Sequence, residues 1–275
     1  MSMNIRYVLC DLDGTLLKNN TEIREEELET IEKVRKKGVK FVVCTGRAIP
    51  FCYEHLKTLG VIGKDDEYVI ASSGSSIVNG KLEPIDVKAI DHEDLCRILD
   101  FTDDHDIFTS FSGNLNNYFL DRFRTYREEL AFYDNCHFYS RDELKEVLKD
   151  ETIVKTMSHI FTKEPQDLMK EKLMPVLKNC EASSSYMHFM DINRTQDHKD
   201  KGLTYFCRAL GCLKDEVLSI GDGHIDRKLL AGSGIAACPV NASDEIKETA
   251  DYISPFDCNH GAVSDILERY ILKEE

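Results

Sequence analysis

The sequence predicts an α/β fold, with a Rossmann-like doubly wound parallel sheet as its core and a smaller α+β cap domain inserted into that core. Short apolar runs such as 7–10 and 39–44 alternate with amphipathic helical stretches, a pattern typical of parallel sheets. Several of these runs end in acidic or hydroxyl residues, where open α/β sheets bind their ligands. We expect residues 1–82 and 191–275 to form the core and residues 83–190 the inserted cap.

The bulk composition restricts the class of partner. The chain has 275 residues and a formal net charge of −15, which argues against a nucleic-acid surface built from clustered Lys and Arg and gives no reason to expect a membrane partner. Its ten cysteines are scattered, without a Cys-x-x-Cys pair, and several lie in apolar runs as small buried hydrophobes. With no signal peptide or membrane-spanning run, we expect a cytoplasmic protein with reduced thiols.

The first strand ends in two carboxylates. The run Tyr7–Cys10 is followed by Asp11, Leu12, Asp13 and Gly14. Buried charges are costly unless something pairs them, so two acids at the end of a buried strand suggest a bound cation, and a cation there suggests an anionic substrate. The same acids could instead shape an ordinary Asp-Gly turn.

A helix over 24–37 and a second buried strand over 39–44 complete a predicted βαβ unit. This helix begins with acidic residues and ends with basic ones, which complements its dipole, and Gly38 terminates it. The second strand ends in Thr45, Gly46 and Arg47, which bring a hydroxyl, a flexible backbone and a cation to the same sheet edge. Backbone N–H groups before a helix favour a phosphate.

A third core strand is expected over 68–71, followed by Ser73 and Gly74 and by a hairpin signal at Asn79-Gly80. In the cap we expect helices near 92–103, 125–133, 141–149 and 165–178, and strands near 107–112, 117–121, 153–161 and 185–190. Ser140 and Glu143 form a plausible capping box. The polar tract 112–117 has two interpretations, a substrate-facing segment or a solvent-exposed hairpin.

The core is expected to resume at Asp191. A helix over 200–210 precedes a buried strand over 216–220, which ends in Gly221, Asp222, Gly223, His224, Ile225 and Asp226. As at the first strand, an apolar run terminates in paired carboxylates. Short strands near 234–238 and 252–254 and helices near 243–250 and 262–272 complete the chain.

The string Asp-Leu-Asp-Gly-Thr-Leu-Leu at 11–17 resembles the first motif of the haloacid-dehalogenase-like phosphohydrolases. Thr45, Lys201 and the Asp222/Asp226 pair are similar to the second, third and fourth motifs. The long insertion and the closing segment 259–265 resemble the Cof-type branch with its large second-type (C2) cap. The resemblance covers nearly the whole chain and implies a phosphatase that acts on a small phosphorylated metabolite, such as a sugar phosphate, pyridoxal phosphate or flavin mononucleotide.

The resemblance also implies roles for the residues. Asp11 would be the nucleophile and Asp13 the general acid and base. Thr45 and Lys201 would bind the transferring phosphoryl group, with Lys201 also offsetting the charge of Asp11. Mg²⁺ would be held by Asp11 and Asp13, the latter through its main-chain carbonyl, together with Asp222 and Asp226. Gly46, Arg47, Ser73 and Gly74 are the predicted substrate contacts.

Three features depart from a simple match. Lys199 competes with Lys201 for the phosphate-binding role, and we prefer Lys201 because the family pattern places Lys-Gly at the helix start. Ile225 replaces the asparagine expected in the fourth motif, and Ser73-Gly74 replaces an Asn-Gly pair. Slower turnover or an altered substrate would follow from the last two.

Two other functions fit the same residues. A phosphomutase or phosphotransferase would pass the phosphoryl group to a second hydroxyl rather than to water. A regulator would bind a phosphorylated metabolite with little catalysis. We expect a small-molecule partner, no nucleic acid or membrane partner, and a monomer or weak homodimer.

Overall fold

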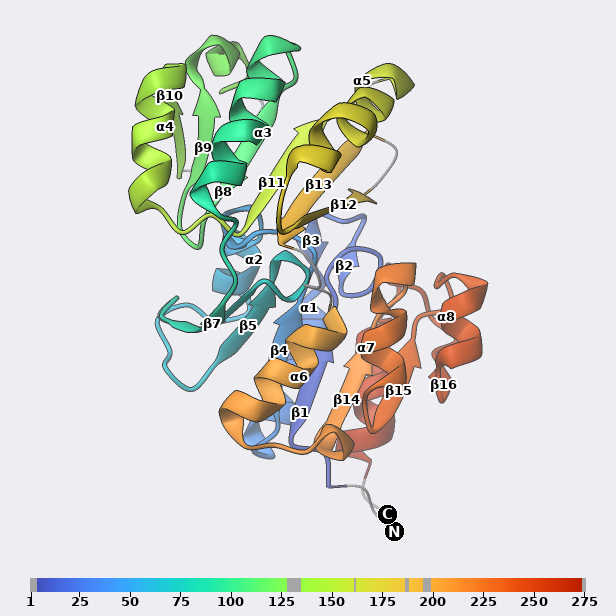
Figure 1. Cartoon of the computed structure of the whole chain (residues 1–275). Helices are drawn as coiled ribbons and strands as arrows, with labels where there is room; N and C mark the ends of the chain where they lie inside the picture. Colours follow the sequence, from blue (N-terminus) through green and yellow to red (C-terminus); the bar gives the residue numbers. More distant parts are fainter. Residues whose placement is uncertain (1–3, 128–134, 161, 186–187, 195–198, 274–275) are drawn as a thin grey trace. The chain divides into compact units, whose positions relative to one another are not determined.

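A computed structural model describes residues 4–127, 135–160, 162–185, 188–194 and 199–273 (Figure 1). The chain divides into two compact units. The first comprises Met1–Gly46, Tyr53–Asp86 and His198–Glu275, and the second comprises Arg47–Cys52 and Val87–Asp197. Within the described residues, no helix has the length and apolar character needed to cross a membrane.

The first unit is built on an eight-stranded sheet with the order β16-β15-β14-β1-β4-β5-β6-β7. Six neighbouring strands, from β16 to β5, are parallel, and β6 runs antiparallel to β5. Its strands are β1 Tyr7–Cys10, β4 Lys40–Cys44, β5 Tyr68–Ala71, β6 Ser76–Asn79, β7 Pro84–Val87, β14 Val217–Ile220, β15 Ile235–Cys238 and β16 Tyr252–Ile253. A separate two-stranded ribbon joins β2 Leu17–Lys18 to β3 Glu22–Ile23.

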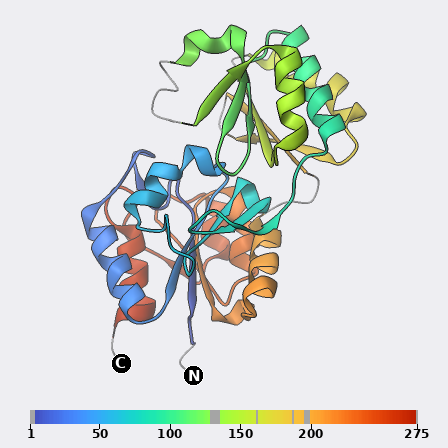
Figure 2. The same ribbon diagram turned by 90° about the vertical axis from the view of Figure 1, so that its left-hand side faces the viewer.

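Helices cover both faces of this sheet. In Figure 2 the blue α1 and the red α9 lie on one side of the strands, and the orange α6 and α7 lie on the other. The helices are α1 Glu25–Lys36, α2 Tyr53–Thr58, α6 Lys199–Leu210, α7 Arg227–Ala231, α8 Asp244–Thr249 and α9 Ala262–Leu267. Because both faces are covered, β1, β4 and β14 read as continuous apolar runs, and all but the first residue of β4 in these strands are buried. The predicted doubly wound core is confirmed.

The order of the central strands brings the predicted motifs to one edge. Strands β14, β1, β4 and β5 are direct neighbours and parallel. Their carboxyl ends therefore lie side by side, and the chain leaves them at Gly221, Asp11, Thr45 and Ser72. This edge is where ligands bind in open α/β sheets.

The second unit contains a six-stranded sheet with the order β10-β9-β8-β11-β13-β12. Its strands are β8 Thr109–Ser112, β9 Asn117–Leu120, β10 Cys136–Tyr139, β11 Lys155–His159, β12 Cys180–Ser185 and β13 Phe189–Arg194. Its helices are α3 His92–Asp104, α4 Arg141–Asp150 and a helical run that starts with α5 Lys163–Leu168 and continues to Val176. Residues from these helices and from the strands form one apolar cluster.

Most of the predicted elements of the second unit are present. Strands β10 and β12 were not predicted, and the helix predicted over 125–133 falls largely outside the described residues. The predicted domain boundary at Asp191 lies inside β13, which pairs with β11 and β12 as far as Arg194. The capping box is confirmed, because the Ser140 backbone N–H donates to Glu143 Oε2 at 3.0 Å.

Candidate active site

Asp11 leaves β1 next to a buried lysine. The Asp11 backbone N–H donates to the Ile220 carbonyl at 2.9 Å, which fixes the end of β1 against β14. The Asp11 carboxylate is 5% exposed, and its Oδ1 accepts a hydrogen bond from Lys199 Nζ at 2.7 Å. Asp13, two residues further on, is half-buried and forms a bridge with Leu17.

The loop after β14 contributes a second acidic group. Asp226 Oδ1 accepts a hydrogen bond from Lys199 Nζ at 2.5 Å, so the lysine joins this loop to Asp11. Asp226 Oδ2 accepts the backbone N–H groups of Asp222 and Gly223 at 3.2 and 3.0 Å. Asp226 therefore fixes the conformation of the loop through Oδ2 and joins the loop to Lys199 through Oδ1. The Asp222 carboxylate lies in this loop, at the edge of the sheet.

The glycine and threonine of the first motif contact Asp222 directly. Thr15 Oγ1 donates to Asp222 Oδ1 at 2.7 Å. Gly14 adopts φ +76°, and a Cβ at this position would lie 2.4 Å from Asp222 Oδ2. The sequence therefore needs glycine here for two reasons, its left-handed backbone and the carboxylate beside it. Thr15 was not among the predicted site residues.

Lys199 and the carboxylates perturb one another strongly. Burial acts to lower the pKa of Lys199, but the carboxylates of Asp11 and Asp226 outweigh it and raise that pKa above its usual value. Burial raises the pKa of Asp222 to about 6, and the nearby charge of Asp226 acts in the same direction while the Thr15 hydroxyl opposes it. Burial also raises the pKa of Asp11, with Lys199 opposing.

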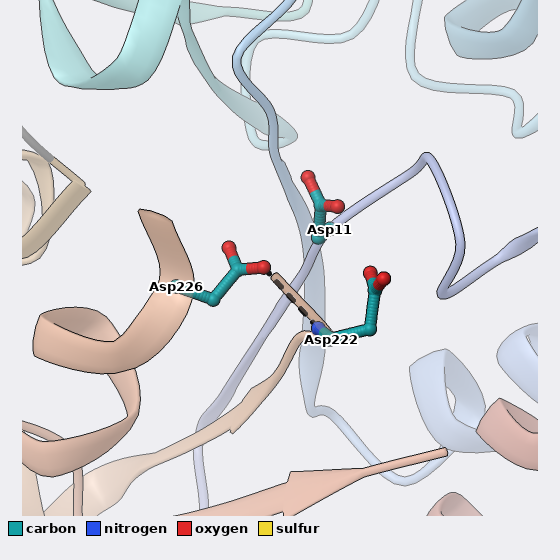
Figure 3. Close-up of side chains that lie close together, drawn as sticks. All are labelled: Asp11, Asp222 and Asp226. Atoms are coloured by element: carbon teal, nitrogen blue, oxygen red, sulfur yellow. Dashed lines mark hydrogen bonds between the residues drawn. The ribbon is translucent and has the colours of Figure 1, made fainter. Parts of the chain in front are cut away.

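The three carboxylates fit a cation. Asp11, Asp222 and Asp226 each offer an oxygen, and these oxygens lie within 4.8 Å of one another. Figure 3 shows the three side chains gathered at the end of the sheet, with the bond from the Asp222 backbone to Asp226 dashed. Three carboxylates and one ammonium group carry a net charge of −2 when ionised. An additional cation would compensate that charge, and oxygen ligands suit Mg²⁺.

The predicted substrate contacts on the neighbouring strands also come together. Thr45 is buried, its N–H donates to Ile70, and its carbonyl accepts the Ser73 N–H at 3.1 Å, which ties the ends of β4 and β5. A Cβ on Gly46 would lie 3.5 Å from Ser73 Oγ and 3.7 Å from Ile225 Cδ1. Gly46, Ser73 and Ile225 are therefore neighbours at this edge.

The turn after β5 has an unusual backbone. Ser72, Ser73 and Gly74 have φ values of 50°, 57° and 101°, and the left-handed region is uncommon for serine. A Cβ on Gly202 would lie 3.1 Å from Gly74 Cα, so this turn packs closely against the first turns of α6. Gly74 therefore lies in close contact with α6, the helix that carries Lys199.

The surroundings of Arg47 and Ile225 bear on two of the predictions made from the sequence. Arg47 belongs to the second compact unit and donates from Nη1 to the Phe51 carbonyl at 3.2 Å. Ile225 is 42% exposed, so the replacement of the expected asparagine by isoleucine does not leave a buried polar group without a hydrogen bond at this position. The backbone bonds to Asp226 orient the loop without an asparagine.

The lysine paired with Asp11 is Lys199, and not Lys201 as the sequence analysis predicted. Side chains two residues apart on an α-helix project about 200° apart, so only one of the two can face the strand edge. Lys199 is 1% exposed, whereas Lys201 is half-buried. Helical spacing gave a usable signal, because Lys199 shares a face with the buried Leu203 and Phe206, at i+4 and i+7.

Comparisons with known proteins identify the family and the fold. The family model of the haloacid dehalogenase-like hydrolases matches residues 8–267. YxeH of Bacillus subtilis is 28% identical, over 98% of this chain and 99% of its own. The 5-amino-6-(5-phospho-D-ribitylamino)uracil phosphatase YcsE of B. subtilis is 25% identical, over 98% and 97%. A HAD/COF-like hydrolase from Plasmodium vivax superposes with a TM-score of 0.80 at 21% identity, over 98% and 97% of the two chains.

The chain belongs to the haloacid dehalogenase-like hydrolase family. A separate mixed sheet is inserted into the core of this chain, and the solved HAD/COF-like hydrolase shares its fold. The resemblance drawn from the four sequence motifs is thereby confirmed.

Proposed function

We propose that this phosphatase hydrolyses a small phosphorylated metabolite through an aspartyl-phosphate intermediate on Asp11, with Mg²⁺ as its cofactor. The observation that carries the proposal is the position of Asp11, which is buried at the end of β1, paired with Lys199 and adjacent to Asp222. The substrate class remains that of sugar phosphates, pyridoxal phosphate or flavin mononucleotide.

In the first step, Asp11 attacks the phosphorus and the ester P–O bond breaks. Lys199 holds Oδ1, so we assign the attack to Oδ2. Asp13 in its protonated form donates its proton to the departing alkoxide. In the second step, Asp13 takes a proton from water, the water oxygen bonds to phosphorus, and the acyl phosphate bond breaks. Phosphate leaves, and the Asp11 carboxylate is restored.

The remaining residues stabilise charge and position. Lys199 and Thr45 would contact the phosphoryl oxygens, with Gly46 and Ser73 beside them and Arg47 as a further contact. Asp11, the main-chain carbonyl of Asp13 and Asp222 would hold Mg²⁺ directly, whereas Asp226 is engaged with Lys199 and the loop backbone. The ion would offset the negative charge of the carboxylates and of the phosphate that approaches them.

Phosphate release from a panel of phosphorylated metabolites tests this proposal, with wild type, Asp11→Asn and Asp66→Asn compared in the presence of Mg²⁺. Asp66 is a matched control, because it is an exposed carboxylate that pairs with Lys40 on the surface. We expect release by wild type and Asp66→Asn only. Full activity in Asp11→Asn would contradict the proposal, and transfer to a second sugar hydroxyl instead of release would indicate a mutase.

A further inference from the structure

Gly14 lies between two peptide groups that bear on the proposed magnesium site. The first peptide group contains the Asp13 carbonyl, which the proposed function assigns to the ion, and the Gly14 N–H. The second contains the Gly14 carbonyl and the N–H of Thr15, whose hydroxyl donates to Asp222 at 2.7 Å. A peptide group is planar, so a contact that fixes its N–H also fixes the direction of its carbonyl, and the reverse. The contacts of Gly14 therefore orient the residues on either side of it.

Two asparagine side chains bind these peptide groups. The Gly14 N–H donates to Asn20 Oδ1 at 2.8 Å, and Asn241 Nδ2 donates to the Gly14 carbonyl at 2.7 Å. Asn20 lies between β2 and β3, whereas Asn241 follows β15 and is distant in sequence. All three residues belong to the first compact unit. The left-handed turn at Gly14, with φ +76°, is therefore bonded on both sides.

Each asparagine is itself held in place. Asn20 adopts φ 57°, in the left-handed region that asparagine enters more readily than most residues. Asn241 Oδ1 accepts the Cys258 N–H at 2.9 Å, so both ends of its amide are bonded. Two residues further on, the Ser243 N–H donates to the Asp222 carbonyl at 3.1 Å. The loop after β15 therefore contacts the segment after β14 as well as the segment after β1.

The two contacts with Gly14 need opposite chemistry. Asn20 accepts a hydrogen bond from Gly14, whereas Asn241 donates one to it. An ionised carboxylate can accept hydrogen bonds but cannot donate them. Aspartate would therefore preserve the contact at position 20 and abolish the contact at position 241. Both asparagines are exposed, so neither substitution buries a charge or opens a cavity.

We propose that Asn20 and Asn241 are positioning residues for the magnesium site and act through the peptide groups on either side of Gly14. This inference rests on the proposed function, in which the Asp13 carbonyl and Asp222 hold the ion. Removal of a group that orients a metal ligand typically weakens metal binding by about 10–100-fold. If the asparagines only satisfied the backbone of an exposed turn, their loss would change stability and leave metal affinity as it was.

Calorimetric titration of Mg²⁺ into the whole protein, without substrate, tests this proposal. We expect Asn20→Ala and Asn241→Ala to weaken Mg²⁺ binding by about tenfold or more. Asn19→Ala is the matched control for Asn20→Ala, because Asn19 has φ 51° and bonds to Asn259 through its backbone N–H. It should leave the affinity unchanged. An equal loss in Asn19→Ala would attribute the effect to the turn and overturn the role of Asn20.

Aspartate variants separate the acceptor from the donor. Asn20→Asp keeps an oxygen for the Gly14 N–H and should bind Mg²⁺ within about threefold of wild type. Asn241→Asp cannot donate to the Gly14 carbonyl and should lose about tenfold or more, as Asn241→Ala does. Each variant adds one negative charge, so an effect of charge alone would change both affinities in the same direction. Such a parallel change would overturn the proposal.

Phosphate release, measured separately, distinguishes failure of this inference from failure of the proposed function. Wild type that binds Mg²⁺ but releases phosphate from no compound would contradict the proposed function, and the titrations would still decide the asparagine roles. Wild type that binds no Mg²⁺ would overturn both the cofactor assignment and the positioning roles. Unchanged Mg²⁺ affinity in both alanine variants, with a lower Tm, would show that the contacts only stabilise the turn, and would overturn the inference.

Discussion

Lys199 Nζ lies 2.7 Å from Asp11 Oδ1, and both side chains are buried. The same ammonium group also pairs with Asp226, so a single lysine joins the ends of two neighbouring strands. The electrostatics of the whole site depend on this contact.

Substitution of Lys199 should therefore abolish most activity. We expect Lys199→Met to lower kcat by roughly 10²–10³-fold, because it removes the positive charge beside the nucleophile and the phosphoryl group. Lys201→Met, two residues along the same helix, should have an effect within about threefold. Phosphate-release kinetics on the two variants would test this assignment. A larger loss of activity in Lys201→Met would assign the phosphate-binding role to Lys201 instead.

Loss of Lys199 should also destabilise the protein. Removal of one partner from a buried ion pair leaves an uncompensated charge and costs about 3–5 kcal/mol. Urea unfolding of Lys199→Met at neutral pH would measure this cost. We expect added Mg²⁺ to recover part of the loss, since the ion would also compensate Asp11; equal stability of variant and wild type without metal would argue against the ion pair.

Metal removal should lower thermal stability through Asp222. A ligand that binds only the folded state stabilises it by about 2.7 kcal/mol at 100 times its Kd. Wild type should show a higher Tm in Mg²⁺ than in a chelator, and Asp222→Asn should show a much smaller difference. A magnesium shift of the same size in Asp222→Asn would exclude that carboxylate as a ligand.

Gly14 should be needed for the position of Asp222. Gly14→Ala would place a Cβ against the carboxylate, so we expect about a tenfold rise in the Mg²⁺ concentration that gives half-maximal activity. Gly38 has a similar φ of +84° with nothing within 4 Å of its added Cβ. Gly38→Ala should therefore show only the backbone cost, about 1–2 kcal/mol of stability, with an unchanged magnesium requirement.

His159 should make stability depend on pH. Burial lowers the pKa of His159 from 6.5 to about 4, and its ring packs edge-on against Phe108 and Phe189. Because the unfolded chain binds the proton more readily, this contribution is complete above about pH 6.5 and is lost as the pH falls towards 4. Unfolding free energies between pH 7 and 4 should drop about 1–2 kcal/mol less in His159→Phe than in wild type, allowing for partial exposure. If the unfolding free energies of wild type and His159→Phe fell equally between pH 7 and 4, the contribution of His159 would be refuted.

Much of this fold could be predicted because the signals are local. The core strands are unbroken apolar runs, and the acids and hydroxyls that follow them mark the edge where the site lies. The short motif favoured Lys201, whereas helical phase places Lys199 beside Asp11. The core was expected to resume at Asp191, whereas Asp191 and Asn193 alternate with the buried Met190 and Ile192 on β13.

The edge strands β10 and β12 were harder to predict for a different reason. Strands at the edge of a sheet pair with a neighbouring strand on one side only. Polar stretches such as 180–185 therefore carry little apolar signal, and their pairing depends on contacts that are distant in sequence.

The short segment Arg47–Cys52 belongs to the second compact unit although it is separated in sequence from the rest of that unit. Phe51 packs against the apolar cluster of the second unit. Exchange of the second unit between relatives would need two grafts rather than one. A chimera that replaces 87–197 alone would set a native Phe51 against a foreign surface. Transfer of 47–52 together with it would preserve that packing.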